Sequence, residues 1–262
     1  MTTPPTTRDI RPSPATFVLI HGAWHGGWCW RFVSERLAAR GHRVFTPTLT
    51  GQGERRHLLG SVTSLDVPIT DIENLIEAEE LRDVVLVGHS YGGLVASGVA
   101  DRKPDALRAL VFLDSLLVES GESAFDVLPR AVVAERMAAV DASGQTLGMP
   151  VPDGLAGTGI PDDHPLAPWV RRRLTPHPLA TYRTPLTLRH PLGNGLPCTY
   201  VHCANPSYDT LAPVRERIRQ KSGWGWASLD SGHDAMVLDP DLLTALLERL
   251  AAAAPSRARA DA

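Results

Sequence analysis

The chain has 262 residues, of which 43% are hydrophobic and 21% charged, and its formal net charge is −3. This length allows one large domain, or a domain with an insertion, around a substantial core. The charges are mixed in sign, and no apolar run approaches the roughly 20 residues that span a bilayer, so we expect neither nucleic-acid nor membrane binding. Residues 1–15 lack the apolar core of a signal peptide. We expect a cytoplasmic protein whose partner is a small molecule. The sequence leaves open whether the protein forms a homodimer.

The cysteine and histidine content argues against a disulfide scaffold and against zinc. The three cysteines cannot all pair, and Cys198 and Cys203 fall within one predicted strand, where they are poorly placed to form a bridge. There is no CxxC or HExxH sequence, and the ten histidines have no ligand spacing. We expect no metal and no cofactor.

Short apolar strands alternate with helical patterns through the first half of the chain. Residues 16–20 form a buried, β-branched run that ends at a glycine-rich loop, and residues 28–40 then show apolar positions at helical spacing. The same alternation continues downstream. The expected strands are 16–20, 43–46, 84–87 and 109–113, and the expected helices are 28–40, 69–81 and 94–101.

The alternation stops after Asp114 and resumes near residue 198. Between them, residues 115–196 are rich in Pro and Gly with short helical pieces such as 131–140, which indicates an inserted helical cap. The expected elements that follow are a strand at 198–203, a helix at 211–221, a strand at 224–229 and a helix at 240–250. Strands alternating with helices predict an α/β fold with a doubly wound, mainly parallel sheet. The expected parts are a core at 16–114 and 197–253, a cap at 115–196, and loose termini at 1–15 and 254–262.

The sequence GHSYG at residues 88–92 joins the most apolar predicted strand to a helix. Glycines two residues either side of Ser90 allow a sharp, strained turn that exposes the serine hydroxyl and points the Tyr91 N–H toward a developing oxyanion. We interpret Ser90 as a nucleophile. The alternative is a glycine-rich turn with a merely exposed serine.

The loop after the first strand, residues 21–28, contains several glycines that let backbone N–H groups approach a ligand. The Ala23 N–H is the natural second oxyanion donor beside that of Tyr91. Such a loop could also bind phosphate, but no GxGxxG spacing or Walker lysine accompanies it.

Serine needs a base, and His233 is the candidate because it follows the last predicted strand and comes after Ser90 in chain order. His89 is interpreted as a packing neighbour of the turn. Asp114 ends one strand and Asp209 follows another, so either carboxylate could orient His233. We favour Asp114, because Asp209 is placed to cap the next helix.

Large apolar residues near these loops and in the cap could form a hydrophobic pocket for an acyl or aryl group, although core packing explains each of them equally well. The candidate pocket residues are Trp24, Trp28, Leu116, Leu117 and Trp169.

Three longer motifs carry a family resemblance: HGAWHGGWCW at 21–30, GHSYGG at 88–93 and GHDAMV at 232–237. With them, the chain resembles the α/β-hydrolase fold, and within it the plant methylesterase and hydroxynitrile lyase group and its bacterial esterase relatives. The resemblance implies a six-stranded core without the usual first hairpin. It also implies the same nucleophile, base and oxyanion donors as above.

The chain departs from that group at two places. The lyases carry Thr and Lys where this chain has Gly22 and Asp234, which disfavours cyanohydrin cleavage. The plant members place their acid in the loop after Cys203, where this chain has Asn205 and Pro206, whereas other branches of the fold place it at the position of Asp114.

The resulting expectation is a serine hydrolase that cleaves a small hydrophobic or aryl carboxylic ester through an acyl-enzyme. Two alternatives stay open, because a fold does not fix a reaction. One is a lyase, C–C hydrolase or cyclase that uses the same site. The other is a ligand-binding sensor with low turnover.

Overall fold

The computed structural model describes residues 14–256. The expectation of loose termini for residues 1–13 and 257–262 lies outside that range. Two residues near the ends of the described range are held by hydrogen bonds. The Ala15 N–H donates to His42 Nδ1 at 3.1 Å, and Arg108 donates to the Ala254 carbonyl oxygen from Nη2 at 2.6 Å.

Six strands form one parallel sheet, in the order β2-β1-β3-β4-β7-β8. Their bounds are β1 Thr16–Ile20, β2 Arg43–Phe45, β3 Val84–His89, β4 Leu107–Leu113, β7 Cys198–Cys203 and β8 Gly225–Leu229. The predicted doubly wound parallel sheet is confirmed. The central strands β1, β3 and β4 are largely apolar and buried because helices cover both faces, whereas the edge strands β2 and β8 are partly exposed.

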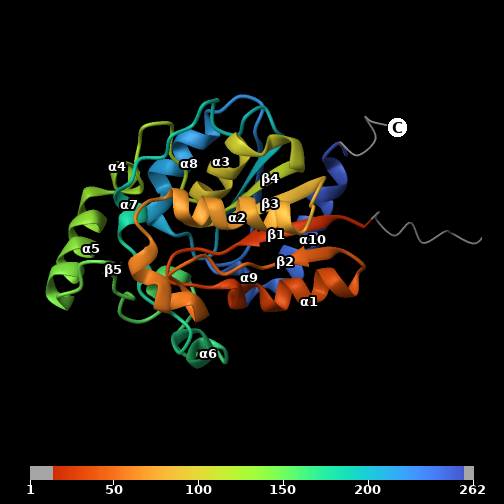
Figure 1. The fold of residues 1–262 in the computed structure, drawn as a ribbon. Helices are drawn as coiled ribbons and strands as arrows, with labels where there is room; N and C mark the ends of the chain where they lie inside the picture. The colour runs from red at the N-terminus through yellow and green to blue at the C-terminus, as the bar shows by residue number, and fades with distance from the viewer. Residues whose placement is uncertain (1–13, 257–262) are drawn as a thin grey trace, which may run out of the picture.

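Successive residues of each strand point into two separate cores, as the twofold period of a strand requires. Val18 and Ile20 belong to one core, and Phe17 and Leu19 to the other. The first core is covered by α2 (Asp66–Ala78), α3 (Gly92–Arg102) and α8 (Ala212–Arg219), and the second by α1 (Arg31–Ala39), α9 (Ala235–Leu238) and α10 (Pro240–Ala253). Figure 1 shows these two helical layers on opposite sides of the strands.

Helix boundaries differ from the predicted ones where local chemistry at the first turn decides them. The predicted helix 69–81 begins earlier, at Asp66. Pro68 lies in its first turn, where proline is tolerated because the backbone N–H groups there have no acceptor within the helix. The predicted helix 28–40 begins as a 3₁₀ turn, η1 (Gly27–Trp30), before α1. A second 3₁₀ segment, η2 (Gly53–Ser61), follows β2 and had not been predicted.

Residues 115–196 connect β4 to β7 through short elements. These are α4 (Ala124–Val127), α5 (Arg130–Ser143), β5 (Gly148–Met149), η4 (Ala156–Thr158), α6 (Ala167–Arg171), β6 (His177–Pro178) and α7 (Ala180–Arg183). β5 and β6 pair as a small antiparallel sheet of their own. In Figure 1, α4, α5 and α7 lie together beyond one end of the main sheet. Within residues 14–256, no helix has the length and apolarity needed to cross a bilayer.

The strand order reverses between β1 and β3, because β2 flanks β1 on one side and β3 flanks it on the other. The register pairs Ile20 with Gly88, and His89 with Leu113, so that β1, β3 and β4 end at the same edge. In open parallel sheets, ligands bind at this edge, in the crevice where the order reverses.

Candidate active site

Ser90 is the first of the two residues between β3 and α3 and has a left-handed conformation, with φ of +52°. For a residue with a side chain this conformation costs about 1–2 kcal/mol. Backbone hydrogen bonds hold it there. The Ser90 N–H donates to the Leu113 carbonyl at 3.1 Å, and the Ser90 carbonyl accepts from Gly93 at 3.0 Å and from Leu116 at 2.9 Å.

The glycines around Ser90 are required by close backbone contacts. A Cβ on Gly88 would lie 2.6 Å from the Gly92 carbonyl oxygen, and a Cβ on Gly92 would lie 2.8 Å from the carbonyl oxygens of Ile20 and His21. The turn therefore packs directly against the end of β1. This contact places the loop after β1 beside Ser90.

His233 and Asp114 lie together at the same edge of the sheet. His233 Nδ1 is 2.7 Å from Asp114 Oδ2, and both side chains are buried. Asp114 directly follows β4 and has a left-handed φ of +40°. Asp209, the alternative acid, is instead exposed in the 3₁₀ turn η5 (Asp209–Leu211). An Nδ1–H bond to a buried carboxylate leaves Nε2 free to act as a base.

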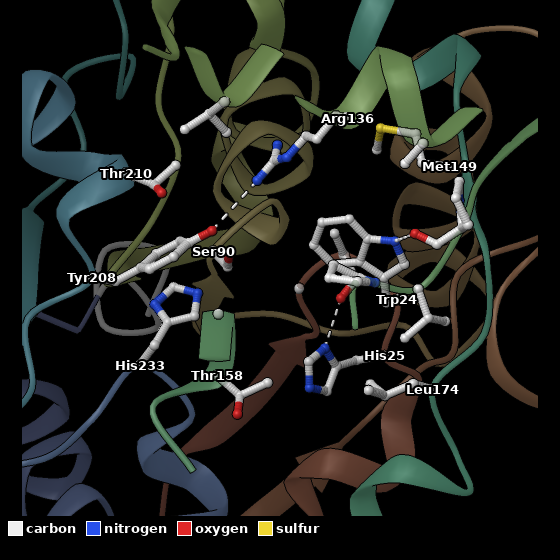
Figure 2. Close-up of a pocket in the computed structure, with 18 of the residues that line it drawn as sticks. Trp24, His25, Ser90, Arg136, Met149, Thr158, Leu174, Tyr208, Thr210 and His233 are labelled. Carbon is white, nitrogen blue, oxygen red and sulfur yellow. Dashed lines mark hydrogen bonds between the residues drawn. The ribbon is translucent and has the colours of Figure 1, made fainter. Parts of the chain in front are cut away.

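The Ser90 hydroxyl forms no hydrogen bond with another residue in the range 14–256, and it faces the same cavity as His233. Figure 2 shows the two side chains next to each other, with the Tyr208 ring alongside. The centroids of the Tyr208 and His233 rings are 4.6 Å apart. Tyr208 thus packs against the imidazole while the hydroxyl of Ser90 stays open to a ligand.

Two backbone N–H groups are candidates to face a ligand at Ser90: Ala23 lines the same cavity as Ser90, and Tyr91 follows Ser90 directly in the chain. Ala23 follows β1 and Tyr91 opens α3, and neither N–H has a hydrogen-bond partner within residues 14–256. Unpaired N–H groups at a helix start attract negative charge. Preorganised N–H donors next to a nucleophile are what an oxyanion site requires.

The loop that carries Ala23 is fixed by a second buried His–Asp pair. His25 Nδ1 donates to the Ala23 carbonyl at 2.7 Å, and His25 Nε2 lies 2.9 Å from Asp234 Oδ2. Burial alone would lower the pKa of His25, but the charge and hydrogen bond of the Asp234 carboxylate raise it above its ordinary value. The imidazole therefore links the Ala23 carbonyl to a buried carboxylate.

His21 holds the same loop from the other side as a neutral imidazole. Its Nδ1–H donates to the Gly22 carbonyl at 2.8 Å, and its Nε2 accepts from the Leu49 N–H at 3.1 Å. Burial lowers the pKa of His21 to about 3. Both roles need an imidazole that keeps one nitrogen unprotonated.

His89 packs beneath the base, as expected for a neighbour of the turn. Its Nε2–H donates to the His233 carbonyl at 3.0 Å, and burial lowers its pKa well below the ordinary value. One potential ligand atom each from His89, His233 and Asp234 lies within 4.8 Å of the others, a spacing that could hold a metal ion. Because His233 is bonded to Asp114 and Asp234 to His25, a metal would compete with both buried pairs.

Above these groups lies a cavity of about 780 Å³. Its apolar and aromatic lining includes Trp24, Leu116, Leu128, Met149, Leu174 and Tyr182. Of the expected pocket residues, Trp24 and Leu116 line it. Trp28 and Trp169 pack against each other instead, with ring centroids 5.1 Å apart, and Leu117 is buried in the core, so these three lie outside the lining.

Several polar residues near the cavity had not been identified from the sequence. Arg215 on α8 is buried beside Asp114, with Nη1 3.5 Å from Oδ1. An arginine between Val214 and Ile218 on the apolar face of a predicted helix is a signal that could have revealed it. Arg136 on α5 and Tyr208 also line the cavity, but neither local sequence indicates that its side chain faces a ligand.

Comparison with known proteins identifies the family and several relatives of this chain. The model of the alpha/beta hydrolase family matches residues 17–246. A carbendazim hydrolyzing esterase from Nocardioides sp. (strain SG-4G) is 42% identical over 250 residues, covering 91% of this chain and 99% of that esterase. Methylesterase 10 from Arabidopsis thaliana is 35% identical over 102 residues, 38% of this chain and 37% of that protein.

The fold also matches a solved structure. An extracellular alpha/beta-hydrolase from a Paenibacillus species, described as sharing structural and functional homology with tobacco Salicylic Acid Binding Protein 2, superposes with a TM-score of 0.79. The match covers 90% of this chain and 99% of the other, at 22% identity. With the family match over residues 17–246, the chain belongs to the α/β-hydrolase family.

Proposed function

We propose that this protein is a serine esterase in which Ser90, His233 and Asp114 form a catalytic triad. The observation that carries the proposal is the buried hydrogen bond of 2.7 Å between His233 and Asp114, at the sheet edge where Ser90 occupies its strained turn. The similarity to a bacterial esterase over nearly the whole chain supports ester hydrolysis.

In the proposed mechanism, Ser90 Oγ attacks the ester carbonyl as His233 Nε2 takes its proton. The oxygen of the carbonyl becomes an anion and accepts hydrogen bonds from the N–H groups of Ala23 and Tyr91. His233 then protonates the departing alcohol, which leaves an acyl group on Ser90. Water, deprotonated by His233, releases the acid and restores the serine.

The substrate is proposed to be a small ester with a hydrophobic or aryl group. A cavity of about 780 Å³ lined largely by apolar and aromatic side chains has the size of pockets that enclose small ligands. Residues 115–196 contribute Leu128, Met149, Leu174 and Tyr182 to that lining. We propose that this segment acts as a cap that determines specificity.

Hydrolysis is favoured over a lyase reaction by the residue after His233. Asp234 is fully buried and bonded to His25, so position 234 presents a paired carboxylate rather than the lysine found in hydroxynitrile lyases of the resembling group. No side-chain cation at position 234 would stabilise a departing cyanide ion. Ester cleavage needs none there, since the alcohol leaves with a proton from His233.

The test is turnover of p-nitrophenyl acetate by the wild-type protein and by Ser90→Ala. We expect Ser90→Ala to lose at least about 10³-fold in kcat, because the nucleophile is removed. A fluorophosphonate probe should label the wild-type protein once, at Ser90, and mass spectrometry identifies the site. Full activity in Ser90→Ala would refute the proposal, and labelling without turnover would identify a sensor.

A further inference from the structure

Arg136 reaches from α5 into the cavity without an acidic partner. Its Cζ lies over the Trp24 and Tyr182 rings, 5.3 Å from each centroid, and Nη2 donates to Tyr208 Oη at 3.4 Å. Nη1 is buried and has no hydrogen-bond partner within the described residues. Figure 2 shows the guanidinium directed toward the Tyr208 hydroxyl, on the side of the cavity where Ser90 and His233 lie.

The acidic residues near Arg136 do not neutralise it. Asp234 lines the cavity but is bonded to His25, while Glu135 and Asp153 are exposed at its rim. Glu135 is also the neighbour of Arg136 in sequence, and adjacent side chains on a helix do not face each other. Within residues 14–256, no ion pair is formed by Arg136.

The Trp24 and Tyr182 rings stabilise part of the charge of Arg136, but Nη1 still has no hydrogen-bond acceptor among the described residues. Rings attract a cation through their faces, whereas the N–H groups of a guanidinium point outward in its own plane. A buried donor without an acceptor destabilises the folded protein, and more so when the donor is charged. A planar pair of N–H groups matches the two oxygens of a carboxylate. The missing partner thus has a defined chemistry.

We propose that Arg136 binds a carboxylate on the substrate, so that the preferred substrate is an ester of an acid or alcohol that carries a second, ionised carboxyl group. This inference rests on the proposed esterase function and narrows its substrate class. Tyr208 links the two sites, because its hydroxyl accepts from Arg136 and its ring packs 4.6 Å from the His233 ring. The carboxylate is therefore bound beside the reacting ester and not in the oxyanion site.

Matched pairs of methyl esters test the proposal. The charged members are the monomethyl esters of phthalic, isophthalic and terephthalic acid, and each neutral partner carries a carboxamide in place of the free carboxylate. We expect the wild-type protein to prefer the charged member of at least one pair in kcat/KM. Arg136→Met should reduce that preference roughly tenfold to a hundredfold, the range for a hydrogen bond to a charged group, and Arg136→Lys should retain part of it.

Arg130→Met is the matched control, because Arg130 is an exposed arginine on the same helix. It should leave the preference unchanged. The binding of the same ester pairs to Ser90→Ala, and to Ser90→Ala with Arg136→Met, is measured by calorimetry and does not depend on turnover. Loss of the charged-ester preference only in the Arg136→Met protein supports the proposal.

The two proposals fail in different ways. Turnover of p-nitrophenyl acetate that depends on Ser90, together with equal kcat/KM for the charged and neutral members of all three pairs, would overturn the role of Arg136 and leave the esterase intact. An unchanged preference in Arg136→Met would overturn it as well. Absence of turnover on every ester would overturn the esterase, and the calorimetry would then decide on Arg136 by itself.

Discussion

Arg215 Nη1 lies 3.5 Å from Asp114 Oδ1, the carboxylate oxygen that is not bonded to His233. The same guanidinium donates to the Tyr208 carbonyl and to Ser207 Oγ, both at 3.0 Å. A buried carboxylate is costly without a counter-charge, and Arg215 supplies it. Arg215 therefore joins the acid of the proposed triad to the loop that carries Tyr208 over His233.

Arg215 is expected to act as a positioning residue. Replacing it by Met removes the counter-charge of Asp114 and one anchor of the Tyr208 loop, so kcat should fall by about 10-fold to 100-fold, as for the loss of a charged hydrogen bond. KM should change little for a small ester. Arg215→Lys should recover part of kcat, and steady-state kinetics on p-nitrophenyl acetate measure both constants. A rise in KM with unchanged kcat would contradict this role.

Asp114 and Asp209 can be distinguished by matched substitutions. Asp114→Asn should lower kcat by roughly 10³-fold to 10⁴-fold, because an amide can hold His233 in the wrong tautomer and cannot stabilise its protonated form. Asp209→Asn changes an exposed residue in η5 and should leave kcat within twofold of wild type. Circular dichroism confirms that both variants are folded. Equal losses in the two variants would rule out this assignment.

Gly92 should not tolerate a methyl group. In Gly92→Ala the new Cβ would meet two backbone oxygens at 2.8 Å, so the end of β1 or the Ser90 turn must shift. We expect a loss of about 1–3 kcal/mol in unfolding free energy together with lower kcat. Gly60→Ala is the control, because its nearest contact would be Leu147 Cδ1 at 3.7 Å. Urea unfolding of both variants provides the comparison.

The His25–Asp234 pair predicts a pH-dependent contribution to stability. The pKa of His25 is raised in the folded protein, so this contribution is fully present below the unfolded pKa of about 6.5 and is lost as the pH rises through the folded value. Asp234→Asn removes the carboxylate and leaves His25 buried without it. We expect the free energy of unfolding of Asp234→Asn to be lower than that of wild type by about 3–5 kcal/mol near pH 6, as is typical when a buried pair is broken. The difference should be smaller at higher pH.

Urea unfolding of wild type and Asp234→Asn at several pH values measures this difference. Because His21 is buried with a lowered pKa in both proteins, its own acid-sensitive contribution cancels in the comparison. Arg36→Gln disrupts the exposed ion pair with Asp241 and serves as a control whose effect should be small at every pH. A difference in unfolding free energy that grows with rising pH would contradict a raised pKa of His25 in the folded protein.

The sequence was sufficient for the sheet because its central strands are short, buried on both faces and separated by helices with regular apolar spacing. The strands at 16–20 and 198–203 were predicted with their observed bounds. The GHSYG turn could be predicted as well, since close backbone contacts at Gly88 and Gly92 leave no room for other residues.

The polar partners of the site could not be predicted because they come from distant parts of the chain. His25 and Asp234 are separated by 209 positions, and nothing in either local sequence indicates the other. Arg136 lies in the segment after Asp114, where no regular alternation constrains the path of the backbone. Trp28 and Trp169 illustrate the converse error, because large aromatic residues next to a functional loop can pack against each other instead of against a ligand.

The left-handed backbone of Ser90 and Asp114 has an evolutionary consequence. Each such residue costs on the order of 1–3 kcal/mol, within a total stability of about 5–15 kcal/mol for a typical domain. Glycine would relieve the strain at position 90 but would remove the proposed nucleophile. Glycine at position 114 would also leave Arg215 buried without its counter-charge. A population selected for thermal tolerance alone should therefore accumulate glycine at position 90 and keep Asp114, and lineages that lost activity in this way would be recognisable by that replacement.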